Sequence, residues 1–290
     1  MKESNLPPVW FITGCSSGLG RALALHVLAR GHRLVATARN PDTLTDLVAQ
    51  GAGRCRALTL DVAQPDQAAV VVATAVSAFG RIDVVVNNAG CGLAGALEEL
   101  GEDQIERCFA TNFFGAMRLT RAVLPILRAQ RCGHFVMISA AAAIANYPGF
   151  SIYGAAKWAL EGMAEALAAE VRPLGLGVTI VQPGPFRTSF VSRSLERGTE
   201  RLPDYDATSG RFLRLVASMD GRQPGDPAKA AEAIVSAVEA EQPPLRLVLG
   251  KYANDKARRK LAVAARELDT WAALGIATDF PAASPGRPQP

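Results

Sequence analysis

The chain has 290 residues, of which 49% are hydrophobic and 20% charged, so it can bury one substantial core and is not composed like a disordered protein. Its net charge of +4 is small, and its cations are scattered rather than gathered in a basic stripe, which argues against nucleic acid as a partner. The five cysteines form no Cys-x-x-Cys pair and the three histidines have no metal-ligand spacing, so we expect a reducing compartment and no metal site.

The N-terminal residues Met1–Pro8 lack the apolar run that a secretion signal needs. The longest apolar stretch, near Ala68–Phe79, is too short to cross a bilayer. We therefore expect a soluble, cytoplasmic protein without a membrane partner.

Apolar runs of strand length alternate with amphipathic stretches of helix length over most of the chain. The runs that predict strands are Val9–Thr13, Arg33–Ala38, Arg56–Asp61, Ile82–Asn87, His134–Ser139, Gly177–Gln182 and Leu245–Leu249. The patterns that predict helices are Leu19–Arg30, Pro41–Gln50, Pro65–Phe79, Glu102–Gln130, Ile152–Arg172 and Pro227–Ala240. This alternation predicts an α/β fold with a doubly wound parallel sheet of the Rossmann type.

Two segments depart from the alternation. The polar stretch at about residues 183–225 follows the carboxyl end of a predicted strand, where such sheets bind ligands, so we expect a lid over the substrate. A charged helix at about Tyr252–Leu274 and a proline-rich, disordered tail over Pro281–Pro290 come last. We therefore expect a single dinucleotide-binding and catalytic domain over residues 1–250 and a helical extension with a tail over 251–290.

A glycine-rich turn, Thr13-Gly14-Cys15-Ser16-Ser17-Gly18-Leu19-Gly20, connects the first strand to the first helix. Gly14 permits a tight turn, Gly18 lets backbone amides approach a pyrophosphate, and Gly20 allows close packing of the helix. A glycine-rich turn alone is also compatible with a plain tight loop. Its place between a first strand and a first helix favours dinucleotide binding.

The end of the second predicted strand indicates which dinucleotide is bound. NAD-binding folds carry a carboxylate there for the ribose 2′-hydroxyl, whereas NADP-binding folds carry a cation. Here the strand ends in Arg39, which can bind a 2′-phosphate through charge-assisted hydrogen bonds, with Ser17 as a second donor. Arginine is also the usual cation of this chain, so a surface role stays open, but we expect NADP(H) as the cofactor.

A tyrosine and a lysine four residues apart, Tyr153 and Lys157, open a predicted helix. Because residues at this spacing lie on one helical face, the Lys157 ammonium can approach the Tyr153 phenol. A nearby positive charge lowers the pKa of a tyrosine, which suits it to general acid and base catalysis near neutral pH. A structural role is also compatible with this pair alone.

Together these residues resemble the short-chain dehydrogenase/reductase family over nearly the whole chain. The glycine-rich turn and the Arg39 strand end look like the branch that contains 17β-hydroxysteroid and retinol dehydrogenases, and the charged C-terminal helix looks like that of its bacterial relatives. The further motifs in the family's order and spacing are Asp61-Val62, Asn87-Asn88-Ala89-Gly90, Asn112 and Pro183-Gly184-Pro185-Phe186-Arg187-Thr188. Taken singly, Asp61 would be a helix N-cap and Asn88-Ala89-Gly90 a turn.

The resemblance implies a role for each motif. Tyr153 would exchange a proton with the substrate oxygen, Lys157 would hold the nicotinamide ribose, and Asn112 would hold a water in a proton relay. Asp61 and Val62 would touch the adenine, Asn88, Ala89 and Gly90 would line the ribose, and Thr188 with the backbone near Phe186 would hold the carboxamide. The cofactor-binding residues indicated in all are Gly14, Ser16, Ser17, Gly18, Leu19, Gly20, Arg39, Asp61, Val62, Asn88, Ala89, Gly90, Tyr153, Lys157, Pro183, Gly184, Phe186 and Thr188.

One position departs from the family pattern. The family places a serine that binds the substrate oxygen thirteen residues before the tyrosine, where this chain has Ala140, and its Ser139 lies one residue early. A shift of one residue on an extended chain turns a side chain to the opposite face. Ser139 could still act as a catalytic residue if the strand has ended, or Asn146, Ser151 or a substrate hydroxyl could supply the donor.

The leading hypothesis is an NADP(H)-dependent oxidoreductase that interconverts a carbonyl and an alcohol on a medium-sized, mostly apolar small molecule, with a pocket that includes Cys91, Leu93, Ala94 and Phe190. Ala140 keeps open a non-redox isomerase, dehydratase or cyclase on the same scaffold, and an NADP(H)-sensing protein without turnover. The helices Glu102–Gln130 and Ile152–Arg172 resemble the family's dimer interface, so we expect a homodimer or homotetramer.

Overall fold

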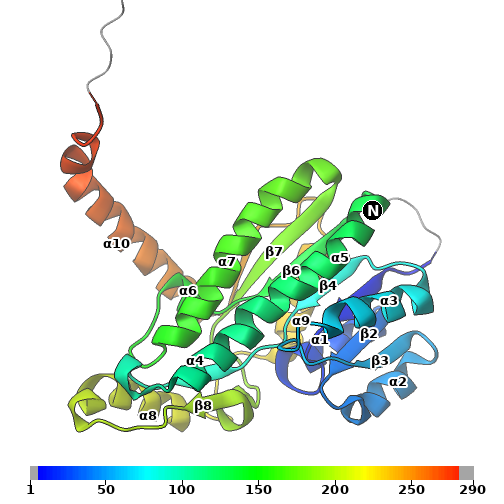
Figure 1. The fold of residues 1–290 in the computed structure, drawn as a ribbon, viewed down its shortest axis with the longest axis horizontal. Coiled ribbons are helices and arrows are strands. Elements are labelled where there is room, and N and C mark those ends of the chain that lie inside the picture. Colours follow the sequence, from blue (N-terminus) through cyan, green and yellow to red (C-terminus); the bar gives the residue numbers. More distant parts are fainter. Residues whose placement is uncertain (1–5, 281–290) are drawn as a thin grey trace, which may run out of the picture.

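The computed structural model describes residues 6–280, and the predicted tail over 281–290 lies outside them. Seven strands form one parallel sheet in the order β3-β2-β1-β4-β6-β7-β9 (Figure 1). The strands are β1 Val9–Ile12, β2 Arg33–Ala38, β3 Cys55–Thr59, β4 Val84–Asn87, β6 Gly133–Ile138, β7 Leu176–Pro183 and β9 Arg246–Leu249. The predicted doubly wound α/β sheet is confirmed.

Helices cover both faces of the sheet, as the strand sequences require. Along β1, Trp10 and Ile12 point into one apolar core and Val9 and Phe11 into the other, because successive side chains of a strand face opposite ways. The first core is closed by α1 Gly18–Ala29, α2 Thr45–Gly51 and α9 Pro227–Glu239. The second is closed by α3 Gln67–Phe79, α5 Ala116–Gln130 and α7 Ser151–Val171.

The stretch predicted as one helix over Glu102–Gln130 is continuous but not uniform. It consists of α4 Glu102–Phe109, a π-helical segment Ala110–Gly115 and α5. At the end of the wide segment Gly115 lies against Val62, and a Cβ on this glycine would lie 2.8 Å from the backbone oxygen of that valine. Single π-helical turns within α-helices are frequent at functional sites.

The stretch over residues 183–225 is folded rather than irregular. It contains β8 Leu195–Arg197, which pairs with β5 Gly92–Ala94 in a second small sheet, and α8 Arg211–Ser218. Its two ends meet where Phe186 pairs with Gly225, and the Arg187 amide donates to the Gly225 carbonyl (2.8 Å). Its polar composition hid the apolar side chains that order it; these are Phe190, Val191, Leu195, Phe212, Leu213 and Val216.

The C-terminal helix α10, Lys251–Ile276, begins against the short helix α6, Ala141–Ile144, and then projects away from the body (Figure 1). Ala253 and Ala257 are its buried residues, and the Lys256 Nζ lies 3.2 Å from the centre of the Tyr147 ring. Within residues 6–280, no helix combines the length and the apolar composition that crossing a membrane requires.

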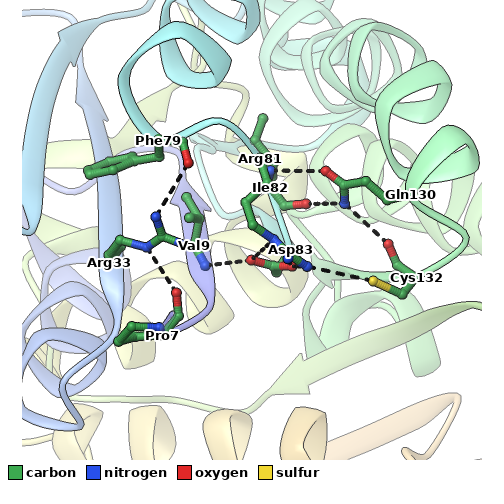
Figure 2. A network of polar contacts seen from close by, with 9 residues as sticks. All are labelled: Pro7, Val9, Arg33, Phe79, Arg81, Ile82, Asp83, Gln130 and Cys132. Carbon is green, nitrogen blue, oxygen red and sulfur yellow. Dashed lines mark hydrogen bonds and ion pairs between the residues drawn. The ribbon is translucent and has the colours of Figure 1, made fainter. Parts of the chain in front are cut away.

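A polar network fastens the amino ends of β1 and β4, opposite the edge where the candidate residues gather (Figure 2). The Asp83 carboxylate is 4% exposed and accepts from the Val9 amide (2.8 Å) and the Arg81 guanidinium (2.9 Å). The Gln130 side chain donates to the Ile82 carbonyl (2.6 Å), which ties the end of α5 to the same edge. These contacts tie the amino ends of β1 and β4 to the end of α5, whereas the candidate residues lie at the carboxyl edge of the sheet.

Candidate active site

The glycine-rich turn and the Asn88 turn meet at the point where the strand order reverses. The chain runs from β1 outward to β3 on one side and from β4 outward to β9 on the other, so β1 and β4 are the central neighbours. The Thr13 hydroxyl accepts from the amides of Asn88 and Ala89, each at 2.9 Å, and thereby joins the turns that follow these two strands. A crevice at such a reversal is where doubly wound sheets bind dinucleotides.

The glycines of the first turn have the geometry that a phosphate cradle needs. Gly14 and Gly18 have φ angles of +72° and +59°, which other residues rarely adopt, so the turn is tight as expected. A Cβ on Gly20 would lie 2.2 Å from the Asn88 side-chain nitrogen, so this glycine makes room for Asn88. The Asn88 amide in turn donates to the Thr13 carbonyl (2.7 Å). The backbone at the start of α1 is therefore open to an anion.

The remaining cofactor candidates near this turn differ in how they are held. Arg39 follows β2 and is exposed, and neither its side chain nor the Ser17 hydroxyl makes a hydrogen bond or ion pair within residues 6–280. Ser16 is also exposed, whereas Leu19 packs on the core. The Asp61 carboxylate accepts from the Ala63 amide (3.0 Å), so it orders a turn rather than capping a helix. Arg39 and Ser17 are thus free to take a ligand.

Lys157, Asn112 and Gly90 come together beside Tyr153 on α7. The Lys157 Nζ donates to the Ile138 carbonyl (2.9 Å), and a Cβ on Gly90 would lie 3.3 Å from that Nζ and 2.8 Å from the Asn112 Oδ1. Asn112 lies in the π-helical segment, and its Nδ2 donates to the Cys91 carbonyl (2.8 Å). The wide helical turn therefore carries the Asn112 amide to the loop that follows β4.

Burial governs the proton affinities of Tyr153 and Lys157. It lowers the pKa of Lys157 to about 8, against weaker raising effects of Cys91, Cys108 and Glu161. It also raises the pKa of Tyr153 well above the usual range, with further raising by Cys108 and Cys91. The expectation that Lys157 lowers the Tyr153 pKa is therefore wrong for this structure, because desolvation of the phenolate is the largest influence. Tyr153 holds its proton and is suited to act as an acid.

Ser139 and Ala140 face opposite sides, and the structure does not bring Ser139 to Tyr153. The Ser139 hydroxyl donates to the Glu161 carboxylate (2.5 Å), which also accepts from the Gln182 amide (2.8 Å). Ala140 packs in the apolar cluster that contains Tyr153. The position that a family serine would occupy is therefore apolar in this chain.

The alternative donors named from the sequence are placed differently. The side-chain oxygen of Asn146, Oδ1, accepts from the Tyr147 backbone amide (2.9 Å), so this side chain is used within its own turn. The Ser151 hydroxyl, at the start of α7, is buried and has no hydrogen bond within residues 6–280.

Two aromatic side chains pack against the ring of Tyr153. The ring centres of Phe150 and Phe190 lie 5.5 and 5.8 Å from that of Tyr153. Leu93 and Ala94 belong to the same apolar cluster, whereas Cys91 lies beside Asn112. The site is therefore bounded by β5, α7 and the folded stretch over residues 183–225, which we call the excursion. Its lining suits an apolar ligand.

The residues of the motif that follows β7, residues 183–188, lie in two different places. Thr188 lies over the glycine-rich turn, where a Cβ on Gly18 would come within 3.5 Å of its Cβ. Pro183 ends β7, the Gly184 amide donates to the Leu249 carbonyl (3.0 Å), and Phe186 packs on the core with α1 and α9. Only Thr188 of this motif is thus brought to the turn.

Sequence reasoning missed four residues of this site. Glu161 follows Lys157 by one helical turn, a spacing that could have revealed it. Phe150 and Cys108 lie three residues before Tyr153 and four before Asn112, so their spacing could also have revealed them. Gln182 carried no comparable signal, because its partner Glu161 comes from α7.

Comparisons with known proteins agree with the resemblance seen in the sequence. The sequence model described as short chain dehydrogenase matches residues 8–198. Retinol dehydrogenase 8 of Homo sapiens is 37% identical over 254 residues, which are 83% of this chain and 80% of that protein. The crystal structure of a short-chain dehydrogenase from Streptomyces avermitilis is 42% identical with a TM-score of 0.90, over 96% of this chain and 100% of that one. A short chain dehydrogenase/reductase from Burkholderia phymatum, in complex with NAD, shares the fold with a TM-score of 0.77 at 22% identity, over 98% of each chain.

Proposed function

Because the chain belongs to the short-chain dehydrogenase/reductase family, we propose that it is an NADP(H)-dependent oxidoreductase that interconverts a carbonyl and an alcohol on a medium-sized, mostly apolar molecule. The observation that carries this proposal is the placement of Tyr153, Lys157 and Asn112 between the glycine-rich turn and an apolar cluster. The phenol, which keeps its proton through burial, would protonate the substrate oxygen during reduction.

The residues at the strand reversal fit a dinucleotide. The tight turn at Gly14 and Gly18 presents backbone amides to a pyrophosphate, and Arg39 and Ser17 have no partner within residues 6–280 that competes for a 2′-phosphate. The bound nicotinamide would supply or accept hydride. The chain's own contribution would be to hold the ribose through Lys157 and to position the carboxamide through Thr188.

Replacing Arg39 with Ala should weaken binding of NADPH by about ten- to a hundredfold and leave NADH binding nearly unchanged, because only NADPH carries the phosphate that Arg39 would bind. Fluorescence titration of both cofactors measures this. Arg128→Ala, which removes an exposed arginine of α5, is the matched control. Equal losses for the two cofactors would remove Arg39 from this role.

The apolar environment of Ala140 leads to a second expected result. Ala140→Ser should raise the reduction of simple ketones several-fold, because a hydroxyl beside Tyr153 could stabilise the developing oxyanion, a contact worth on the order of a hundredfold in other enzymes. Ser139→Ala should affect turnover much less than loss of a catalytic donor would, since its hydroxyl donates to Glu161. Steady-state turnover of both variants on one accepted ketone tests this. A Ser139→Ala loss as large as that expected from removing the Tyr153 hydroxyl would restore Ser139 as a catalytic residue.

Ala140 is also the observation that favours a second candidate, a non-redox isomerase, dehydratase or cyclase that uses Tyr153 as its acid. Absorbance of NADPH during turnover separates the two functions. Consumption of NADPH with substrate supports the oxidoreductase, and product without consumption supports the alternative.

We further propose a cytoplasmic homodimer or homotetramer in which copies meet along α5 and α7. The groove between these helices is lined by apolar and mixed side chains; among them are Met117, Leu124, Met163 and Ala166. Sedimentation of the purified protein measures the assembly state.

A further inference from the structure

Two cysteines share one amide group at the edge of the proposed active site. Cys91 follows the Asn88-Ala89-Gly90 turn, and Cys108 lies in the last turn of α4. The Asn112 Nδ2 is 3.6 Å from the Cys91 sulfur and 3.4 Å from the Cys108 sulfur. Both sulfurs therefore lie against the same side-chain nitrogen. Residues seventeen apart in sequence thus form a thiol pair that cysteine spacing did not predict.

The two members of the pair differ in accessibility and in proton affinity. Cys91 is partly exposed, whereas Cys108 is 2% exposed. The neighbouring Cys108 thiol lowers the pKa of Cys91 against the effect of burial, with smaller lowering effects of Thr111, Lys157 and Asn112. The same contact, together with burial, raises the pKa of Cys108. Cys91 is therefore the thiol of the pair that a solvent-borne oxidant can reach and the more acidic of the two, and Cys108 is the buried thiol beside it.

The other cysteines lack this arrangement. The Cys15 thiol donates to the Ile12 carbonyl (3.2 Å), and burial raises the pKa of Cys15 to about 12 and that of Cys55 to about 11. Cys132 is partly exposed, and its sulfur lies 3.8 Å from the Arg81 guanidinium. It has comparable access to solvent without a neighbouring thiol among the described residues, which makes it an internal control.

We propose that Cys91 and Cys108 form a dithiol that peroxide oxidises to a disulfide, and that this disulfide lowers turnover by shifting Asn112. The Cys91 thiolate attacks one oxygen of a hydroperoxide, the O–O bond breaks, and the other oxygen leaves as water or an alcohol after taking a proton. The resulting Cys91 sulfenic acid is attacked by the Cys108 sulfur. The S–O bond breaks, and the hydroxide leaves as water with the Cys108 proton. In balance, one hydroperoxide and two thiols give a disulfide, water and water or an alcohol.

Oxidation of this pair would disturb the residues around Lys157. A disulfide holds its sulfurs about 2.05 Å apart, which is closer than two thiols that are not covalently joined can approach. Asn112 donates to the carbonyls of both Cys91 (2.8 Å) and Cys108 (2.9 Å), so drawing the sulfurs together must shift this amide. Asn112 also lies next to Gly90 and, through it, to the Lys157 ammonium. We expect turnover to fall at least tenfold on oxidation; this effect on turnover rests on the proposed function, whereas disulfide formation does not.

Hydrogen peroxide applied to the reduced full-length protein tests the proposal in two independent readouts. Mass spectrometry of unreduced peptides should show a Cys91–Cys108 crosslink, formed about tenfold faster at pH 7 than any oxidation of Cys132, because the lowered pKa of Cys91 favours the thiolate that attacks peroxide. Turnover should fall with the same rate and return with dithiothreitol. Cys108→Ser should instead leave a Cys91 sulfenic acid that dimedone traps, and Cys132→Ser should behave as the unmodified protein.

The outcomes separate this proposal from the proposed function. If Cys91 and Cys108 both stay open to alkylation at peroxide levels that oxidise Cys132, the dithiol is overturned. If the crosslink forms and turnover is unchanged, the control of activity is overturned. If the protein shows no reductase activity at all, the proposed function fails and the crosslink measurement still decides whether the dithiol exists.

Discussion

Tyr153→Phe should reduce turnover by about 10²- to 10⁴-fold while leaving NADPH affinity nearly unchanged. The substitution removes the phenolic proton but keeps the ring that packs between Phe150 and Phe190. Steady-state kinetics and a cofactor titration on the same preparation measure the two effects separately. The loss of turnover can be assigned to the missing hydroxyl only if the aromatic packing is retained. Thermal unfolding of the variant checks this.

Tyr205→Phe is the matched control for this variant. It makes the same chemical change on the surface, where the Tyr205 hydroxyl donates to Glu98 (2.6 Å), and turnover should stay within its usual range. Retained activity in Tyr153→Phe would move the acid role to another group. In that case the buried Ser151 hydroxyl, which has no partner within residues 6–280, is the next candidate.

Lys157→Met should damage both turnover and cofactor affinity, because Lys157 is proposed to hold the ribose and lies beside Asn112. The substitution also changes how stability depends on pH. Burial lowers the pKa of Lys157 from its usual 10.5 to about 8, so between these values the unfolded chain binds a proton that the folded chain does not. The unfolding free energy of the unmodified protein should therefore rise with pH from about 8 to 10.5 relative to the variant, by up to about 3 kcal/mol.

Denaturant unfolding of both proteins over this pH range measures the difference. Below pH 8 the full cost of burying the ammonium is present, so Lys157→Met should be the more stable of the two there, provided that the methionine packs as well. Parallel pH profiles for the two proteins would show that Lys157 keeps its ordinary proton affinity.

The sheet and its helices could be read from the sequence because each follows from a local pattern. The alternation along β1 alone assigns Trp10 and Phe11 to opposite cores, and the strand bounds agree with the predictions to within one or two residues. The opposite orientation of Ser139 and Ala140 also follows from this period of two. What the sequence does not contain is the partner of Ser139, since Glu161 comes from a helix on another part of the chain.

The proton affinity of Tyr153 could not be predicted for the same reason. The spacing to Lys157 indicates a lowered pKa, but burial of the phenol raises it, and Phe190, one of the rings packed on Tyr153, lies far along the chain. The π-helical segment was likewise hidden, and its last residue, Gly115, packs against Val62, which follows a distant strand. Local periodicity thus predicts elements, whereas long-range contacts decide the chemistry.

The excursion after β7 leaves and rejoins the sheet through a narrow neck, where Phe186 pairs with Gly225, and this neck has an evolutionary consequence. The Gly225 amide donates to the Pro185 carbonyl (3.1 Å), so the segment leaves the sheet and returns to it at one place. Lengthening a loop whose ends are already joined costs only about 0.6 kcal/mol per doubling of its length. Insertions and deletions beyond the neck can therefore reshape the wall over Tyr153 without moving a strand. Ligand preference in this lineage can drift through changes in loop length while the sheet and its cofactor crevice stay constant.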